Sequence, residues 1–180
     1  DMIEGDVNDI TNVAESGYAK FLNNIHKDSR KSTILKNLTF EPGDALTAYS
    51  ISDNEYYLRS LNYIEDAKIY ILPDTVNTNL VNLVVTVKDL FPIVVGFSAS
   101  GLDEFEGNVK NINLQGTGHE LSNSLLVYTD KNPMLGYQGD LTFRNMWESF
   151  FDGTFTYRTD HKEKLAKILI NKEFITPETK

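Results

Sequence analysis

Residues 80–90, with the sequence LVNLVVTVKDL, decide how the rest of the chain is interpreted. Apolar residues recur there at every second position, namely Val81, Leu83, Val85 and Val87. Polar residues lie between them, with Val84 as the one exception. This alternation, in a segment rich in β-branched residues, predicts a β-strand. Pro92 follows closely, and because proline lacks the N–H that a sheet ladder requires, it predicts the end of the strand.

Two helices are predicted before this strand. The first follows Asp28 and Ser29, which are good N-cap residues, and its apolar positions have helical spacing: Ile34, Leu35 and Leu38. A turn at residues 41–44 (EPGD), with proline and glycine at its central positions, separates the two helices. The second helix is predicted to begin at Ser52, because Ser52 and Glu55 have the spacing of a capping box.

A second strand is predicted at residues 67–72 (AKIYIL), which alternate in the same way. The polar loop 73–79 leads from this strand to residues 80–90, so the two strands are expected to form an antiparallel hairpin. Residues 17–27 fit a short helix as well as a strand. The predicted fold class of this part is α+β, with two helices covering one face of a small sheet.

The pattern changes after Pro92, where helices are expected to be absent until about Lys162. Residues 137–144 (YQGDLTFR) and 151–158 (FDGTFTYR) alternate without error between aromatic or apolar residues on one side and charged or hydroxyl residues on the other. They predict two strands joined by the loop 145–150. A water-soluble sandwich produces this alternation, and so does a transmembrane β-barrel, whose apolar side chains face lipid. The pattern by itself leaves both alternatives open.

Composition excludes several classes of function. The chain has 180 residues and a net charge of −9, which argues against binding to nucleic acid or to anionic membrane surfaces, since both require an excess of Lys and Arg. It contains no cysteine, which excludes disulfides and thiolate nucleophiles. It also lacks a run of about 18 apolar residues, so no transmembrane helix is predicted.

No catalytic, metal-binding or cofactor-binding residue is predicted. The three histidines do not have the spacing of a zinc site: His26, His119 and His161. Residues 116–118 (GTG) predict a tight turn, because a phosphate-binding loop would require a further glycine and a following helix. The carboxylates of Asp103, Glu104 and Glu106 are interpreted as solvated loop charges.

Residues 24–89 resemble a POTRA domain, the polypeptide-transport-associated repeat of the BamA-like outer-membrane assembly family (bacterial surface antigen family). The motifs that carry this resemblance are the Gly-Asp turn at 43–44, the Arg-x-Leu pattern at 59–61 and the segment YIEDA at 63–67. The resemblance continues after Pro92. Residues 113–118 (NLQGTG) resemble a turn near the start of the barrel in this family, and residues 174–180 resemble a barrel segment.

The resemblance implies a domain organisation. Residues 1–16 would be a linker or the tail of an upstream element, residues 17–91 a POTRA-like domain of the order β-α-α-β-β, and residues 92–180 the N-terminal antiparallel strands of an outer-membrane β-barrel. It also implies that residues 18–27 form the first strand. The roughly 90 residues after Leu90 are too few to close the 16-stranded barrel that the family implies, so a truncated barrel is expected.

The function implied is assembly or insertion of outer-membrane proteins, or protein translocation, without covalent chemistry. The POTRA part would lie in the periplasm and the barrel in the bacterial outer membrane, in contact with its lipid. Unfolded outer-membrane client polypeptides and periplasmic or lipoprotein partners would add a strand to a sheet edge. By this analogy residues 67–72 form the edge strand, and Lys68, Tyr70 and Leu72 flank the bound segment.

Two alternatives remain at this stage. A two-partner-secretion type transporter would use the same fold for one dedicated substrate. A soluble β-rich ligand-binding or hydrolase domain would instead use the acidic loop 103–106. It would require the aromatic residues of the strands after Pro92 to lie in a water-soluble core.

Overall fold

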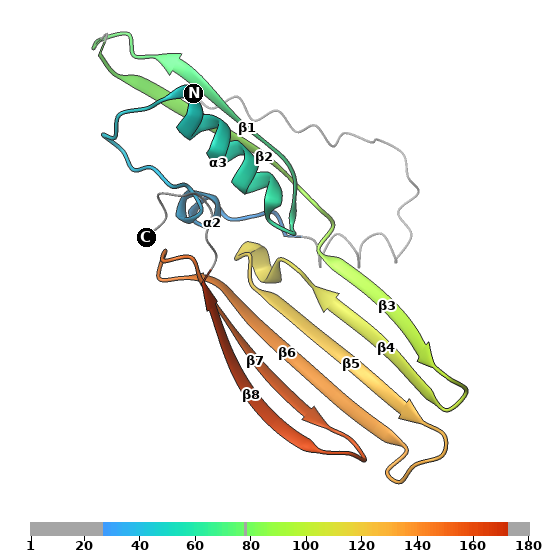
Figure 1. The fold of residues 1–180 in the computed structure, drawn as a ribbon. Coiled ribbons are helices and arrows are strands. Elements are labelled where there is room, and N and C mark those ends of the chain that lie inside the picture. Colours follow the sequence, from blue (N-terminus) through green and yellow to red (C-terminus); the bar gives the residue numbers. More distant parts are fainter. Residues whose placement is uncertain (1–26, 78, 173–180) are drawn as a thin grey trace, which may run out of the picture.

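The structure is a computed structural model that describes residues 27–77 and 79–172. The chain forms two parts that lie end to end (Figure 1). The first part contains two helices and a two-stranded sheet, and the second is a six-stranded antiparallel sheet. The predicted linker 1–16, the predicted first strand apart from Lys27, and the segment 174–180 lie outside the described residues.

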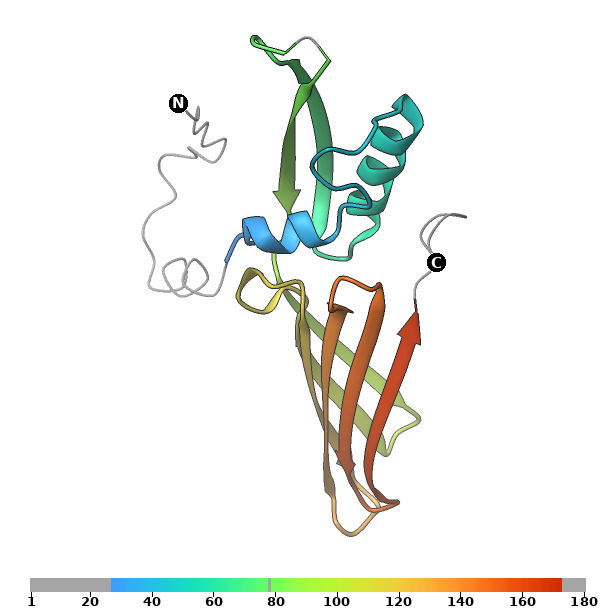
Figure 2. The same ribbon diagram turned by 90° about the vertical axis from the view of Figure 1, so that its left-hand side faces the viewer.

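The first part consists of α2 (Lys31–Lys36), α3 (Ala48–Ser60), β1 (Ile64–Pro73) and β2 (Val81–Asp89). β1 and β2 pair in antiparallel fashion with Ile69 opposite Val85, which confirms the predicted hairpin. Both helices lie against this hairpin, at its side and at its base (Figure 2). The described order is therefore α-α-β-β.

The alternation in residues 80–90 has the predicted consequence for packing. Val85 and Val87 pack against the hydrophobic core, whereas Thr86 and Lys88 on the opposite face are exposed. The centre of this core is formed by Leu58 on α3, Tyr63 and Ala67, each at most 1% exposed. Ile112, which follows β4 of the six-stranded sheet, belongs to the same cluster, so the two parts share one core.

The start of α3 differs from the prediction. Thr47 is the N-cap: its hydroxyl accepts from the Ser50 N–H, and the Ser50 hydroxyl accepts from the Thr47 N–H, both at 3.0 Å. The helix therefore begins at Ala48, and Ser52 lies inside it. The prediction was wrong because two Ser/Thr-initiated cap patterns lie close together, and the earlier one adds a turn to the helix.

The cap predicted for the first helix was also wrong. Arg30 occupies the N-cap position of α2 and makes no side-chain capping bond. Ser29 instead binds other parts of the chain: its N–H donates to the Asp89 carboxylate, and its hydroxyl accepts from the Asn113 side chain. The predicted turn at 41–44 is present, with a hydrogen bond of 3.1 Å from the Asp44 N–H to the Glu41 carbonyl.

The second part begins at the predicted position after Pro92. Its strands are β3 (Ile93–Ser100), β4 (Glu104–Asn111), β5 (Glu120–Tyr128), β6 (Leu135–Met146), β7 (Phe151–Thr159) and β8 (Lys164–Lys172). Each pairs with the next in antiparallel fashion, so β3 and β8 form the two edges and the sheet is not closed within the described residues. A short 3-10 helix, η1 (Leu114–Gly116), lies between β4 and β5.

The predicted strands at 137–144 and 151–158 are confirmed as parts of β6 and β7, with Leu141 opposite Phe155. The expected helical segment after Lys162 was wrong, because Lys164–Lys172 forms the strand β8. Leu165 and Leu169 lie on the face opposite Ile168 and Ile170, so both faces of this strand carry apolar residues and its period of two is obscured. In the described ranges, no helix is both long enough and apolar enough to cross a membrane.

Candidate interaction surfaces

The six-stranded sheet has one apolar face that runs across all its strands. The pairing register brings alternating apolar residues of β3–β8 onto the same side, as expected from the alternation in β6 and β7. These residues include Val95, Phe97, Val109, Leu125, Tyr137, Leu141, Phe143, Phe155, Tyr157 and Ile168. Phe97 and Ile168 are 76% and 73% exposed. Within the described residues no second layer buries this face, which distinguishes it from the inner face of a sandwich.

The opposite face of the sheet is polar and internally hydrogen-bonded. The Thr142 and Thr154 hydroxyls lie 3.0 Å apart, and the Thr156 hydroxyl donates to Asp140 at 2.7 Å. Asn108 donates from one amide group to the hydroxyls of two β5 serines, at 2.8 and 2.9 Å. These contacts link neighbouring strands across the face.

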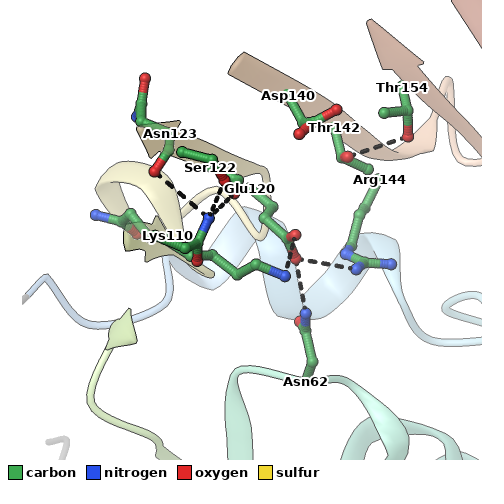
Figure 3. Close-up of polar contacts among 12 residues, drawn as sticks. Asn62, Lys110, Glu120, Ser122, Asn123, Asp140, Thr142, Arg144 and Thr154 are labelled. Carbon is green, nitrogen blue, oxygen red and sulfur yellow. Dashed lines mark hydrogen bonds and ion pairs between the residues drawn. The ribbon is translucent and has the colours of Figure 1, made fainter. Parts of the chain in front are cut away.

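A charged cluster lies where this polar face meets the first part of the chain (Figure 3). The Glu120 carboxylate accepts from Lys110 at 2.9 Å, from Arg144 at 3.3 Å and from the Asn62 amide at 3.0 Å. Arg144 also binds Asp152, at 3.0 Å. Because Asn62 lies two residues after the end of α3 and the others belong to the sheet, the cluster connects the two parts to each other.

The glycine turn of residues 116–118 forms a second connection between the two parts. The Gly116 carbonyl accepts from the Arg30 N–H and from the Thr33 hydroxyl, both at 2.8 Å. Gly116 has a φ of 74°, and a Cβ there would lie 2.2 Å from the Asp28 carbonyl oxygen. Only glycine combines this left-handed backbone with so close an approach. The predicted tight turn is therefore present, and in the fold it attaches the six-stranded sheet to the start of α2.

The opposite end of the sheet is held by Asp160, in the turn between β7 and β8. Its carboxylate accepts from Arg158 and Tyr128 side chains, at 2.8 and 3.1 Å, and from the N–H groups of Lys162 and Glu163. Burial alone would raise the pKa of Asp160, but these hydrogen bonds hold that pKa well below its usual range. Sequence reasoning missed this cluster.

The sequence-predicted site residues Lys68, Tyr70 and Leu72 all lie in β1 with exposed side chains. The pairing places them on one face, the face away from Ala67 and the core. Among the described residues β1 pairs with β2 alone. Within these residues, one side of β1 is therefore not paired with another strand, and both the edge position and the binding role of the three residues remain predictions.

Side chains of α3 reach the outer edge of β1. Glu55 accepts a hydrogen bond of 2.9 Å from the Ile69 N–H, and Arg59 donates one of 2.7 Å to the Ala67 carbonyl. The Ile69 hydrogen bond lowers the pKa of Glu55 despite the opposing effect of burial, and Lys68 lowers it further. Sequence reasoning treated Glu55 as a capping residue and missed this contact.

The acidic segment at 103–106 does not form a carboxylate pair. Asp103 lies in a turn and contacts Thr129, whereas Glu104 belongs to β4 and pairs with Lys162 at 3.3 Å. In the part of the chain that the structure describes, no group of three or more His, Asp or Glu residues is arranged to hold a metal ion.

Comparison with known proteins supports the fold only. No protein-family model matches the sequence, and no curated protein matches it. Among solved structures, the chain is similar to BamA from Haemophilus ducreyi lacking POTRA domains 1-3, with a TM-score of 0.60 and 16% sequence identity. The match covers 73% of this chain and 25% of that chain, so this chain spans about a quarter of its length. The chain therefore has a BamA-like fold.

Proposed function

We propose that this chain acts in the assembly, insertion or translocation of proteins at the bacterial outer membrane and catalyses no covalent chemistry. In this proposal β3–β8 are strands of a membrane barrel, with the apolar face toward lipid and the polar face toward the interior. The first part is a POTRA-type domain in the periplasm. The uncovered apolar face over six strands is the observation that carries the proposal.

The lengths of four of the six strands agree with a membrane location. About 9–11 residues span a bilayer as a tilted β-strand. β5, β7 and β8 have nine residues each and β6 has twelve, whereas β3 and β4 are one residue shorter than this range, at eight. A large apolar side chain gains about 1.5–3 kcal/mol on leaving water completely. A sheet with this many exposed aromatic and aliphatic side chains is therefore more stable against lipid than against water.

The soluble alternative is less consistent with the same face. It requires the aromatic residues of β6 and β7 to lie in a water-soluble core, yet Tyr137, Phe143 and Phe155 are 40–44% exposed. The acidic segment 103–106, which that alternative would use as its site, contains no positioned pair of carboxylates.

The edge of β1 is the proposed binding site for unfolded outer-membrane polypeptides and for periplasmic or lipoprotein partners. A strand edge offers unpaired N–H and C=O groups to any extended segment, so it tolerates many sequences. Lys68, Tyr70 and Leu72 supply the side chains next to that edge, and their exposure supports the proposal.

Photo-crosslinking to a defined peptide tests this function. The full chain in lipid nanodiscs would carry a photoreactive residue at Leu72 or, as a matched control, at the exposed Thr86 of β2. The probe is the synthetic peptide FDGTFTYR, which corresponds to residues 151–158 and alternates in the manner of a barrel strand. We expect crosslinking at Leu72 that is lost when alternate peptide nitrogens are methylated. Equal crosslinking at Leu72 and Thr86 would contradict the proposed site.

A further inference from the structure

The outer edge of β1 is partly occupied by the chain itself. Glu55 and Arg59 lie one turn apart on α3, and together they satisfy one N–H and one C=O of this edge, those of Ile69 and Ala67. The two groups flank Lys68. In an antiparallel sheet, a neighbouring strand would supply its own C=O and N–H at the same two positions. The two side chains therefore take the place of one N–H group and one C=O group that a neighbouring strand would supply.

The same contacts identify which backbone groups of β1 point outward. The N–H and C=O groups of one residue point to the same edge of a strand, and those of the next residue point to the opposite edge. The Ile69 N–H points to α3, and the pairing with β2 is regular from Asp66 to Pro73. The N–H and C=O of Ile71 therefore point outward as well. The Glu55–Arg59 pair does not reach them, and the Ile71 side chain is 51% exposed.

We infer that the β1 edge is divided into a section at residues 67–69 that α3 closes and a section at residues 70–72 that accepts one extended polypeptide strand. This inference rests on the proposed function and defines its site more narrowly. Ile71 makes the pair of backbone hydrogen bonds to the partner strand, and Glu55 marks where that pairing stops.

Lys68 has a different role here from the one predicted by the sequence. Its ammonium group lies 3.3 Å from Glu55, whose carboxylate also faces Arg59 at 3.5 Å. Lys68 therefore holds the closed section in place, whereas Tyr70 and Leu72 flank the bound strand. The three residues predicted as one site belong to two functional sections.

The side chains around the open section define the chemistry of the partner. Tyr70 and Leu72 are 55% and 50% exposed on one face, and Ile71 is exposed on the other. Aromatic and β-branched side chains form the favourable cross-strand pairs with such neighbours. The partner is an extended polypeptide segment with aromatic or β-branched residues at alternate positions. A contact centred on three residues binds weakly and accepts many sequences.

Amide hydrogen exchange of the full chain in nanodiscs tests, in the absence of any ligand, whether the β1 edge is divided into a closed and an open section. We expect the Ile69 amide to be protected and the Ile71 amide to exchange rapidly. Glu55→Ala should accelerate exchange at Ile69 at least tenfold, and Glu55→Gln, which keeps an acceptor oxygen, should retain most of the protection. The control Glu65→Ala removes an exposed carboxylate of β1 and should leave Ile69 unchanged. Equal exchange at Ile69 and Ile71 in the unmodified chain would overturn the inference.

The peptide FDGTFTYR then tests the position of the partner strand. It should protect Ile71 in the unmodified chain, and in Glu55→Ala its protection should extend to Ile69 with severalfold tighter binding. Two results would contradict the claim that α3 closes residues 67–69 to the partner strand. One is that the peptide protects Ile69 of the unmodified chain beyond its ligand-free value, and the other is that the peptide binds Glu55→Ala no more tightly. Failure of the peptide to bind any variant, with Ile69 still protected, would contradict the proposed function and the open section with it.

Discussion

The two sheets of this molecule alternate apolar and polar side chains in the same way, but within residues 27–77 and 79–172 only one of them has its apolar face covered. In the two-stranded sheet that face packs against α2 and α3, and Ile69 is 7% exposed. In the six-stranded sheet the corresponding face is open, and Ile168 is 73% exposed. A period of two therefore defines a strand and its two faces, whereas the surrounding elements decide whether the apolar face meets protein or another medium.

Truncation of one apolar residue in each part gives the largest expected contrast. Leu58 is fully buried, so Leu58→Ala should lower the free energy of unfolding of the first part by about 2–5 kcal/mol. Ile168→Ala, at an exposed position, should cost less than about 0.5 kcal/mol in detergent-free buffer. Urea unfolding followed by circular dichroism measures both. Similar losses for the two variants would show that Ile168 is also buried.

The next prediction separates the two parts from each other. Gly116→Ala combines a left-handed backbone with a contact to the Asp28 carbonyl, and it should cost roughly 1–3 kcal/mol. It should also accelerate exchange of the Arg30 amide, which donates to Gly116. Gly43→Ala is the control, because its φ is also positive but a Cβ there meets nothing within 4 Å. Unchanged Arg30 exchange in Gly116→Ala would contradict the docking role of this turn.

A smaller effect is expected at the far end of the large sheet. Asp160→Asn weakens the bonds to Arg158 and to two backbone N–H groups, and it should cost roughly 1–2 kcal/mol. The folded-state pKa of Asp160 is lowered, so its contribution is present above the unfolded pKa of about 3.9 and is lost as the pH falls through the folded value.

Exchange of the Lys162 and Glu163 amides measures this effect of Asp160. Both amides should exchange faster in Asp160→Asn, and the difference from the unmodified chain should persist at pH 5. If these two amides exchange equally slowly in Asp160→Asn and in the unmodified chain at pH 5, the Asp160 carboxylate does not stabilise the turn between β7 and β8.

The smallest effect concerns the open face of the small sheet. Lys88 pairs with Glu65 at 2.8 Å, but their side chains are 66% and 46% exposed. Such surface pairs contribute about 0–1 kcal/mol, so Lys88→Gln should leave the urea midpoint nearly unchanged. A loss comparable to that of Leu58→Ala would mean that this face is covered in the full chain.

The sequence predicted those elements whose pattern is local. Residues 80–90 and the hairpin of β6 and β7 follow directly from alternation, which the strand backbone itself imposes. The start of α3 was misplaced because Thr47 and Ser52 both have the chemistry of an N-cap. β8 was missed because leucines occur on one of its faces and isoleucines on the other.

The contacts between the two parts could not be predicted in this way. Asn62 and Glu120 are 58 positions apart, and the residues around each of them show no pattern that predicts their contact. The closed section of the β1 edge was missed for a related reason. Glu55 fits a capping box in the sequence, whereas in the fold its carboxylate lies against a strand 14 positions away.

The orientation of the large sheet toward lipid is the central claim, and spin-label accessibility tests it most directly. Because the chain contains no cysteine, single cysteines at Ile168 and Thr156 can each carry one nitroxide in the chain reconstituted into phospholipid bilayers. The Ile168 label should collide mainly with oxygen dissolved in the bilayer, and the Thr156 label mainly with a water-soluble nickel complex. Accessibility of the Ile168 label to nickel alone would contradict the membrane assignment.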